Sequence, residues 1–418
     1  MLAADRRERR PDPVLARRAV PRFEPFTGIV YETDRVRLSD VVSPPYDVLD
    51  EADRQALEAL SPYNAVRIDL PRDTDRRDRY AEARCLLDTW LSEGVLRRDP
   101  EPTLYVYRMG FYDEAGRARQ TAGVIGAMEI SPVGEGDVLP HEHTMSKPKD
   151  DRLNMRRSCN ADMSPIWGLS LAAGLSALCE MPGGPDLRVT DPDGVHHRLW
   201  RITQPGMLDA ISEAVASAPV MIADGHHRYE TATAHRDEMH AAGKGPGGHD
   251  LVMTYVVELT EEQLAVRPIH RLLRRLPAGV DLVEALGELF EVVALGVADP
   301  GSMPDRMVEA GGLGLVVGGD GFLLVPRPGK FDGVDDVDSA YIAHAIAGIG
   351  EQIDVSYQHG AGVVADIVAK GDADAAVLLR PVSVDKIAAT ARARQKMPPK
   401  STFFHPKLRT GLVFRPLD

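Results

Sequence analysis

The chain has 418 residues, of which 44% are hydrophobic and 27% are charged, and its formal net charge is -14. This composition is typical of a globular protein with one or two domains, and the acidic balance argues against broad binding to nucleic acid or to an anionic membrane. The three cysteines form no Cys-x-x-Cys pair, and no apolar run approaches the ~20 residues that span a bilayer. We therefore expect a cytoplasmic protein without a disulfide framework and without a nucleic-acid or membrane partner.

Residues 1–22 are rich in arginine and contain no apolar stretch of the signal-peptide type, which predicts a disordered basic leader. A basic contact arm is the alternative. Alternating apolar and polar residues predict a strand at 65–70. The other elements expected before residue 217 are helices at 50–60, 75–93 and 207–216, and hairpins at 105–130 and 186–202.

Residues 218–259 form the sharpest local pattern. A compact apolar strand at 218–223 leads through a short turn into a helix at 227–242, which Gly243 ends in a C-cap position. A glycine-rich loop then leads to a strand at 251–259.

Beyond Pro277 helices and strands alternate, which suggests a second layered structure. We therefore predict a mixed α/β chain with an N-terminal domain at 23–277 and a C-terminal α/β domain at 278–418. Its expected elements are helices at 283–290, 339–347, 361–370 and 384–395, a hairpin at 313–325, and strands near 353 and at 375–379 and 410–415.

The residues Asp224-Gly225-His226-His227-Arg228 stand where the strand gives way to the helix. The first amides of a helix lack internal partners and its dipole is positive there, so such a terminus binds phosphate oxygens. Gly225 allows close backbone approach, and the two histidines and Arg228 add donors. Asp224 could bind Mg²⁺, orient a histidine or accept a proton. The alternative is a plain helix start, capped by Asp224, with solvated histidines.

A second cluster is Pro140-His141-Glu142-His143-Thr144, which is followed by Lys147 and Arg152. On a strand Glu142 would face away from both histidines, so the pattern fits zinc poorly. Glu142, His141 or His143 could act as a catalytic acid or base, and the cations that follow could neutralise phosphates. A polar loop with solvated charges is the alternative.

A third cluster lies at residues 396–407. Lys400-Ser401 has the ending of a P-loop, but the P-loop glycines are missing, so this motif is excluded. Paired prolines form a rigid loop that could hold Lys400, Ser401 and Lys407 near an anion. The alternative is a simple connector before the last strand.

Several stretches together resemble the domain-of-unknown-function family numbered 1015. They span nearly the whole chain. The matching stretches are residues 44–48, 61–64 with Arg67, 140–144, 151–152, 164–166, 223–231, 268–272 and 396–413.

The turn at 224–228 is also similar to the phosphate-binding turn of the ParB/sulfiredoxin-like superfamily, which includes sulfiredoxin, CTP-binding ParB proteins and free-serine kinases. The kinases carry an especially similar Asp-Gly-His-His-Arg string. This resemblance implies a ParB/sulfiredoxin-like phosphate-binding core with β-hairpin additions. His226 stands where the sulfiredoxin cysteine would fall, which disfavours sulfinic acid reduction. The kinases' catalytic glutamate has no matching position, and no ParB-type helix-turn-helix is evident.

These features predict a kinase-like phosphotransferase that uses ATP, ADP or pyrophosphate with Mg²⁺ and acts on a small hydroxyl compound, free serine being the acceptor that the resemblance implies. A phosphate-ester hydrolase and a non-catalytic nucleotide sensor are the alternatives. The expected roles are donor binding for Gly225, His227 and Arg228, stabilisation of the transferring group by His226, acid–base or metal chemistry for Asp224, His141 and Glu142, and secondary phosphate contacts for Lys147, Arg152 and Lys400.

Overall fold

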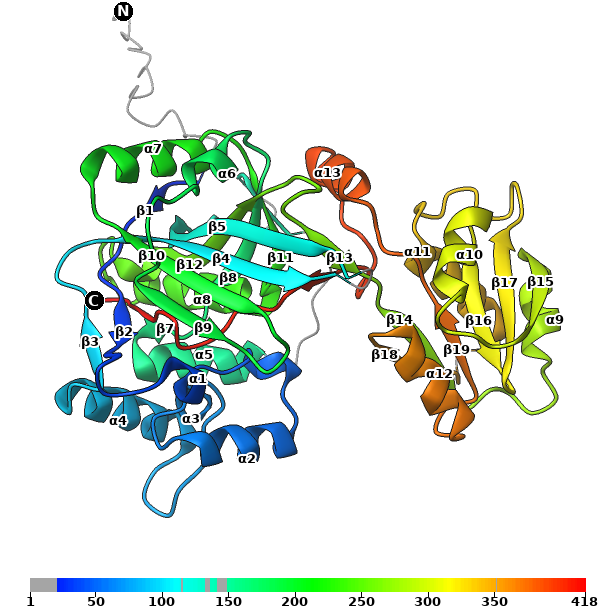
Figure 1. The fold of residues 1–418 in the computed structure, drawn as a ribbon, viewed down its shortest axis with the longest axis horizontal. Helices are drawn as coiled ribbons and strands as arrows, with labels where there is room; N and C mark the ends of the chain where they lie inside the picture. The colour runs from blue at the N-terminus through cyan, green and yellow to red at the C-terminus, as the bar shows by residue number, and fades with distance from the viewer. Residues whose placement is uncertain (1–20, 114–115, 132–135, 141–148, 351) are drawn as a thin grey trace, which may run out of the picture.

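The structure is a computed structural model that describes residues 21–113, 116–131, 136–140, 149–350 and 352–418. It contains a nine-stranded sheet and a six-stranded sheet, each packed with helices (Figure 1). The mixed α/β class predicted from the sequence is therefore confirmed. Among the helices in these ranges, none has both the length and the apolar character needed to cross a bilayer. The expected leader falls mainly on residues 1–20, outside the described residues.

The nine-stranded sheet has mixed pairing. Its strand order is β6-β11-β8-β12-β5-β4-β10-β9, with β1 paired to β5, and the pairs β6–β11 and β8–β12 are parallel. The strands are β1 (Phe23–Glu24), β4 (Leu104–Tyr112), β5 (Ala118–Glu129), β6 (Val138–Pro140), β8 (Ile166–Ser170), β9 (Leu187–Thr190), β10 (His196–Ile202), β11 (Val220–Asp224) and β12 (Leu251–Glu258).

Both faces of this sheet are buried, because successive side chains of a strand point to opposite faces. Ile166 and Trp167 are neighbours in β8, yet they belong to different hydrophobic clusters. Residues of α4 and α5 join one cluster, and residues of α6, α7 and α8 join the other. The helices are α4 (Arg79–Ser92), α5 (Lys149–Cys159), α6 (Leu175–Leu178), α7 (Pro205–Val215) and α8 (His226–Ala241).

The six-stranded sheet is antiparallel throughout, in the order β15-β17-β16-β19-β14-β18. Residues of α9 and α11 pack in the hydrophobic cluster on one face, and residues of α10 and α12 pack in the cluster on the other. The elements are α9 (Leu282–Gly287), α10 (Met303–Ala310), α11 (Asp338–Ile349), α12 (Ala361–Ala369), β14 (His270–Arg274), β15 (Phe290–Val297), β16 (Leu313–Val317), β17 (Asp320–Pro326), β18 (Asp354–Gln358) and β19 (Ala375–Leu378).

The chain enters the six-stranded sheet and then returns to the first. A ribbon of β13 (Ala265–Arg267) with β20 (Phe403–His405) and helix α13 (Val384–Arg392) lie between the two sheets (Figure 1). β21 (Arg415–Pro416) then pairs with β7 (Ala161–Asp162). The chain therefore does not pass from one sheet to the other at the expected boundary after residue 277. β14 belongs to the six-stranded sheet but precedes that boundary, and the C-terminal strands β20 and β21 pair with strands of the N-terminal part of the chain.

The remaining short elements lie outside the nine-stranded and six-stranded sheets, and all but one of them precede residue 100. The strand predicted at 65–70 is wrong, because this segment contains the helical turn α3. The side chain of Asn64 accepts a hydrogen bond from the amide of Val66 at 3.0 Å and donates to the carbonyl of Asp40 at 2.8 Å, which favours the turn. These elements are α1 (Leu38–Val41), η2 (Tyr46–Val48), α2 (Glu51–Leu60), α3 (Val66–Asp69), η3 (Gly248–Asp250), and the pair β2 (Ile29–Tyr31) with β3 (Leu96–Arg98).

The buried ring of His270 predicts a specific pH dependence of stability. Its Nδ1 accepts a hydrogen bond from the amide of Leu379 at 3.1 Å, and burial lowers its pKa to about 4. The unfolded chain binds the proton more tightly, so the stabilising contribution is present above about pH 6.5 and is lost as the pH falls toward 4. We expect His270→Asn, which keeps an acceptor but does not titrate, to reduce the pH slope of the unfolding free energy by up to about 1.4 kcal/mol per pH unit. Urea unfolding between pH 4.5 and 7.5 measures this slope, and equal slopes for both proteins would contradict the assignment.

Candidate functional site

The candidate site begins where β11 ends. β6 and β11 are parallel and Pro140 pairs with Ile222, so both strands end at the same edge of the sheet. Gly225 follows with φ 89°, and α8 starts at His226. A Cβ at Gly225 would lie 2.9 Å from Ile166 and 3.0 Å from the Arg228 side chain, so both the positive φ and the close packing require glycine. The strand–turn–helix prediction for this segment is confirmed within two residues.

The N-cap residue of α8 is Gly225, which makes no side-chain hydrogen bond to the first turn. The alternative in which Asp224 merely caps the helix is therefore wrong. The cap position is occupied by Gly225, and glycine has no side chain that could form the capping bond. The amide end of a sixteen-residue helix stays oriented toward this turn with its positive dipole. The start of α8 consequently keeps the electrostatic character that favours an anion.

The carboxylate of Asp224 lies between two cations. Its Oδ1 is 3.3 Å from Nζ of Lys407, and its Oδ2 is 3.3 Å from Nη2 of Arg228. Burial alone would raise the pKa of Asp224, but the charges of Lys407, Arg228 and His226 outweigh burial and hold it well below its usual range. Asp224 is therefore ionised at neutral pH, between two cationic side chains.

Arg228 also ties this turn to the loop before β8. Its Nη1 donates to Oγ of Ser164 at 3.0 Å and to the carbonyl of Pro165 at 2.5 Å. Its side chain is only 11% exposed. Its Nε is buried without a hydrogen-bond partner among the described residues, so one donor of this guanidinium remains unsatisfied within the described part of the chain.

Arg152, expected as a phosphate contact, lies in α5 and directs its donors to protein groups. Its Nη1 donates to the carbonyl of Asp69 at 2.7 Å, and its Nη2 donates to Asp151 at 2.6 Å. The guanidinium also stacks 4.1 Å from the ring centroid of Tyr46. These bonds join α5 to the Tyr46 turn and to α3, and a phosphate would have to compete with them.

A small cavity separates Arg228 from Arg152. Its volume is about 50 Å³, which accommodates a few water molecules or one small ion but is well below the size of a nucleotide pocket. A nucleotide would therefore not fit inside it. The lining includes Tyr46, Asp69, Arg152, Ser164, Arg228 and Thr231.

The third cluster, residues 396–407, contributes Lys407 to the site. The lysine of its P-loop-like ending, Lys400, does not contact Asp224. Lys400 is exposed, and its carbonyl accepts a hydrogen bond from Arg271 at 3.1 Å. Lys407 is the residue that reaches Asp224, and its ammonium also lies 4.5 Å from the ring centroid of Phe403. The pairing of β20 with β13 carries this segment to the site.

The other predicted site residues have mixed positions. His226 and His227 are partly exposed at the start of α8. His141, Glu142 and Lys147 lie outside the described residues, and their roles stay predictions.

A magnesium ion does not fit Asp224 as the described residues are arranged. Both carboxylate oxygens face cations, and Mg²⁺ prefers an octahedral shell of oxygen ligands. A protein-bound metal at Asp224 would first have to displace Lys407 or Arg228.

Three residues of this neighbourhood were not predicted as site residues, namely Tyr46, Asp69 and Ser164. Tyr46 and Ser164 each stand beside a proline, in Pro45-Tyr46 and Ser164-Pro165, and proline fixes the backbone of a turn. Two rigid turns were therefore the available signal, but the sequence did not indicate that both turns meet Arg228 and Arg152.

The family described as "Protein of unknown function (DUF1015)" matches residues 23–356. The chain belongs to this family. The DUF1015 match contains Asp224 and Arg228 but ends before Lys407, so one of the two cations on Asp224 lies outside the matched range. A search of curated proteins found no match.

Several solved structures resemble the chain at low identity. A free serine kinase mutant in complex with AMP has 13% identity and a TM-score of 0.37, over 64% of this chain and 84% of the kinase. A conserved hypothetical protein from Pyrococcus furiosus has 12% identity and a TM-score of 0.35, over 66% of this chain and 92% of its own. SbnI with C-terminal truncation from Staphylococcus aureus has 13% identity and a TM-score of 0.35, over 68% and 85%.

The contacts of Arg228 predict that it is important for stability. Arg228→Met would leave Asp224 with one cation and remove the bonds to Ser164 and Pro165. We expect a loss of about 3 kcal/mol in unfolding free energy, because removing one member of a buried ion pair leaves the charge of its partner less well compensated. Arg157→Met is the matched control, since Arg157 forms an ion pair with Glu238 at 44% exposure, and should cost less than about 1 kcal/mol. Urea unfolding measures the loss of unfolding free energy in both variants. Similar losses would show that the contacts of Arg228 contribute no more to stability than an exposed ion pair.

Proposed function

We propose that the chain is a kinase-like phosphotransferase that binds the phosphates of its donor at the start of α8. The observation that carries this proposal is the Asp224 carboxylate held between Lys407 and Arg228 directly before the start of α8. The helix dipole and two cations favour a polyanion, and a phosphate that takes Lys407 as its partner would leave Oδ1 of Asp224 to contact an acceptor.

Lys407 is the donor contact in this proposal. Its Nζ is 3.3 Å from Asp224, and its side chain is 16% exposed, so a phosphate oxygen arriving at the turn can become a second partner of the ammonium. Arg228 is fixed by Ser164 and Pro165 and therefore positions Asp224. Gly225 brings the backbone amides of the turn close to the bound phosphate.

Asp224 acts on the acceptor. Its low pKa makes it a weak base, but phosphoryl transfer passes through a loose transition state that needs positioning more than base strength. The acceptor hydroxyl oxygen forms a new bond to the terminal phosphorus while the bond to the leaving phosphate oxygen breaks. The leaving group keeps the electron pair of that bond, and the hydroxyl proton passes to Asp224 and then to water.

ATP, ADP or pyrophosphate is the donor in this proposal, with Mg²⁺ arriving on the phosphates, and a small hydroxyl compound such as free serine is the acceptor. His226 would contact the transferring group, and Lys400 and Arg152 would be outer phosphate contacts. A phosphate-ester hydrolase uses the same groups with water in place of the hydroxyl, and a nucleotide sensor uses the same anion site without transfer.

Lys407→Met tests donor binding. We expect phosphoserine formation from ATP, ADP or pyrophosphate with serine to fall about 100-fold or more, because one charged contact to the transferring phosphate is lost. Phosphorus NMR follows the product, and calorimetry with the same donors follows binding. Lys396→Met is the matched control, since Lys396 is an exposed lysine of the same segment.

The outcomes separate the alternatives. Phosphate release without phosphoserine, over a panel of hydroxyl compounds, would indicate a hydrolase, and tight binding without any product would indicate a sensor. Equal donor binding by wild type and Lys407→Met would contradict the location of the site.

Asp224→Asn separates binding from transfer. Removal of the negative charge favours a bound polyanion, so donor affinity should be equal or tighter, whereas turnover should fall about 100-fold or more because the proton acceptor is lost. Separate measurement of donor Kd and kcat provides the comparison. A variant that turns over at the wild-type rate would exclude Asp224 from the proton transfer.

A further inference from the structure

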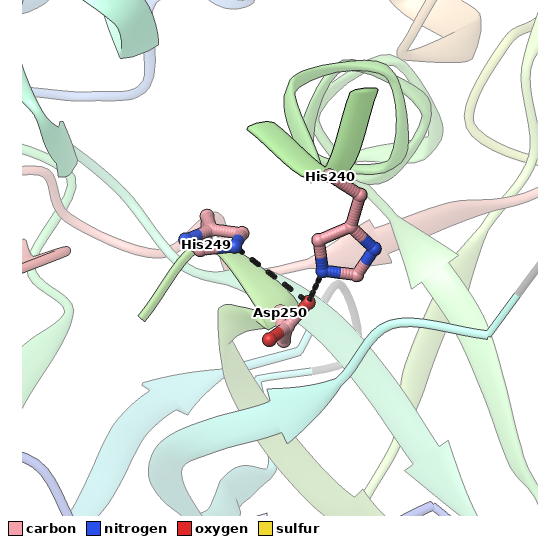
Figure 2. A group of neighbouring side chains, drawn as sticks. All are labelled: His240, His249 and Asp250. Atoms are coloured by element: carbon pink, nitrogen blue, oxygen red, sulfur yellow. Dashed lines mark ion pairs between the residues drawn. The ribbon is translucent and has the colours of Figure 1, made fainter. Parts of the chain in front are cut away.

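The opposite end of α8 contains a second group of polar side chains. His240 lies in the last turn of α8, and His249 and Asp250 lie in η3, directly before β12. Figure 2 shows both imidazoles directed toward the carboxylate of Asp250. One ligand atom from each of the three residues can be chosen so that all lie within 4.8 Å of one another.

The distances within this group are close to those of a coordination shell. Nε2 of His240 is 2.7 Å from Oδ1 of Asp250, and Nε2 of His249 is 4.0 Å from the same oxygen (Figure 2). Two ligand atoms on one tetrahedral Zn²⁺ lie about 3.4 Å apart, given bond lengths of about 2.0–2.2 Å. Each of these two distances therefore differs from the bound value by less than about 1 Å.

His249 supplies the observation that points to a ligand. Its side chain is 8% exposed, and its Nε2 is buried without a hydrogen-bond partner among the described residues. A buried polar atom that lacks a partner is destabilising, and this atom faces the Asp250 carboxylate across a gap of metal-ligand size.

We propose that His240, His249 and Asp250 bind one divalent transition-metal ion of the zinc class. Two imidazole nitrogens and one carboxylate oxygen are a ligand set that Zn²⁺ accepts, with water in the fourth position. His240 is 48% exposed, so its ring has room to move outward. For a metal to bind at Nε2 of His240, any proton on that nitrogen has to move to the other ring nitrogen or to solvent.

The loop around the ligands is held by other contacts. Oδ2 of Asp250 accepts a hydrogen bond from the amide of Gly247 at 2.9 Å, which leaves Oδ1 for the metal. Arg415 donates to the carbonyl of Gly248 at 2.7 Å. A Cβ at Gly248 would lie 2.4 Å from the carbonyl oxygen of Leu417, so this glycine is required by close packing. Such outer contacts orient metal ligands.

The site joins the end of α8 to the start of β12. His240 is fourteen residues beyond His226, which corresponds to about 21 Å along a helix. The metal would therefore fix the far end of the helix that begins at the proposed phosphate site, without contacting the phosphate. Metal binding and donor binding can fail independently, so this inference does not rest on the proposed function.

Cobalt and zinc titrations of the tag-free full chain, after removal of metal by a chelator, test the site. We expect one Co²⁺ per chain with the strong visible absorption of a four-coordinate ion, lost when Zn²⁺ displaces it. His240→Ala and Asp250→Asn should each weaken metal binding more than about tenfold. Loss of a residue that only hydrogen-bonds to a zinc ligand already weakens zinc binding by about tenfold or more, and these two residues would be ligands themselves. Zn²⁺ should also raise the Tm of the wild type and not that of His240→Ala.

His240→Ala carries the test because its half-exposed ring can be removed without disturbing the core, whereas buried His249 is needed for packing. His196→Ala is the matched control, since His196 is an exposed histidine on β10 that pairs with Thr190. Absence of a saturable cobalt band, or a band equally strong in His240→Ala and Asp250→Asn, would overturn the proposal.

Discussion

The candidate site depends on one interaction, the shared ion pair of Asp224 with Arg228 and Lys407. The three residues come from the end of β11, the first turn of α8 and the segment after β20. Their mutual attraction outweighs the burial that would otherwise raise the pKa of the carboxylate. The same interaction therefore fixes the charge of the site and brings a distant part of the chain to it.

Arginines with several protein partners connect the segments around this ion pair. Arg152 connects α5 to Asp69, while Arg156 and Arg415 both pair with Asp162. All of these side chains are at most 7% exposed, so each charge has to be matched by a partner in place. Neither element of such a pair can move alone without leaving a buried charge. The surroundings of Asp224 are thus a rigid charged layer beneath a partly exposed turn.

The sequence was sufficient for the local features and insufficient for long-range ones. The apolar strand, the glycine and the helix of 220–241 follow from patterns within a few residues, which is why they were predicted closely. Whether Lys400 or Lys407 approaches Asp224 depends on the pairing of Arg267 with Phe403, which no local pattern contains. The distant protein partners of Arg152 and Arg228 could not be predicted for the same reason. Both side chains were therefore expected to donate hydrogen bonds to a phosphate. Alternation at 65–70 indicated a strand, but the side-chain bonds of Asn64 determine a helical turn there.

The pairing of β13 with β20 makes the intervening residues 268–402 a closed excursion whose two ends meet. Because most of that excursion folds into the six-stranded sheet, with α13 on the return path, its length need not be held closed at the entropic cost of a flexible loop of the same size. During evolution this inserted segment could be replaced by another folded segment. A replacement whose two ends lie equally close together would leave β13 and β20 paired in the same register. Helix α13 on the return path packs Ile387 and Ala391 into a hydrophobic cluster of the first sheet, so the part open to exchange is the six-stranded sheet itself.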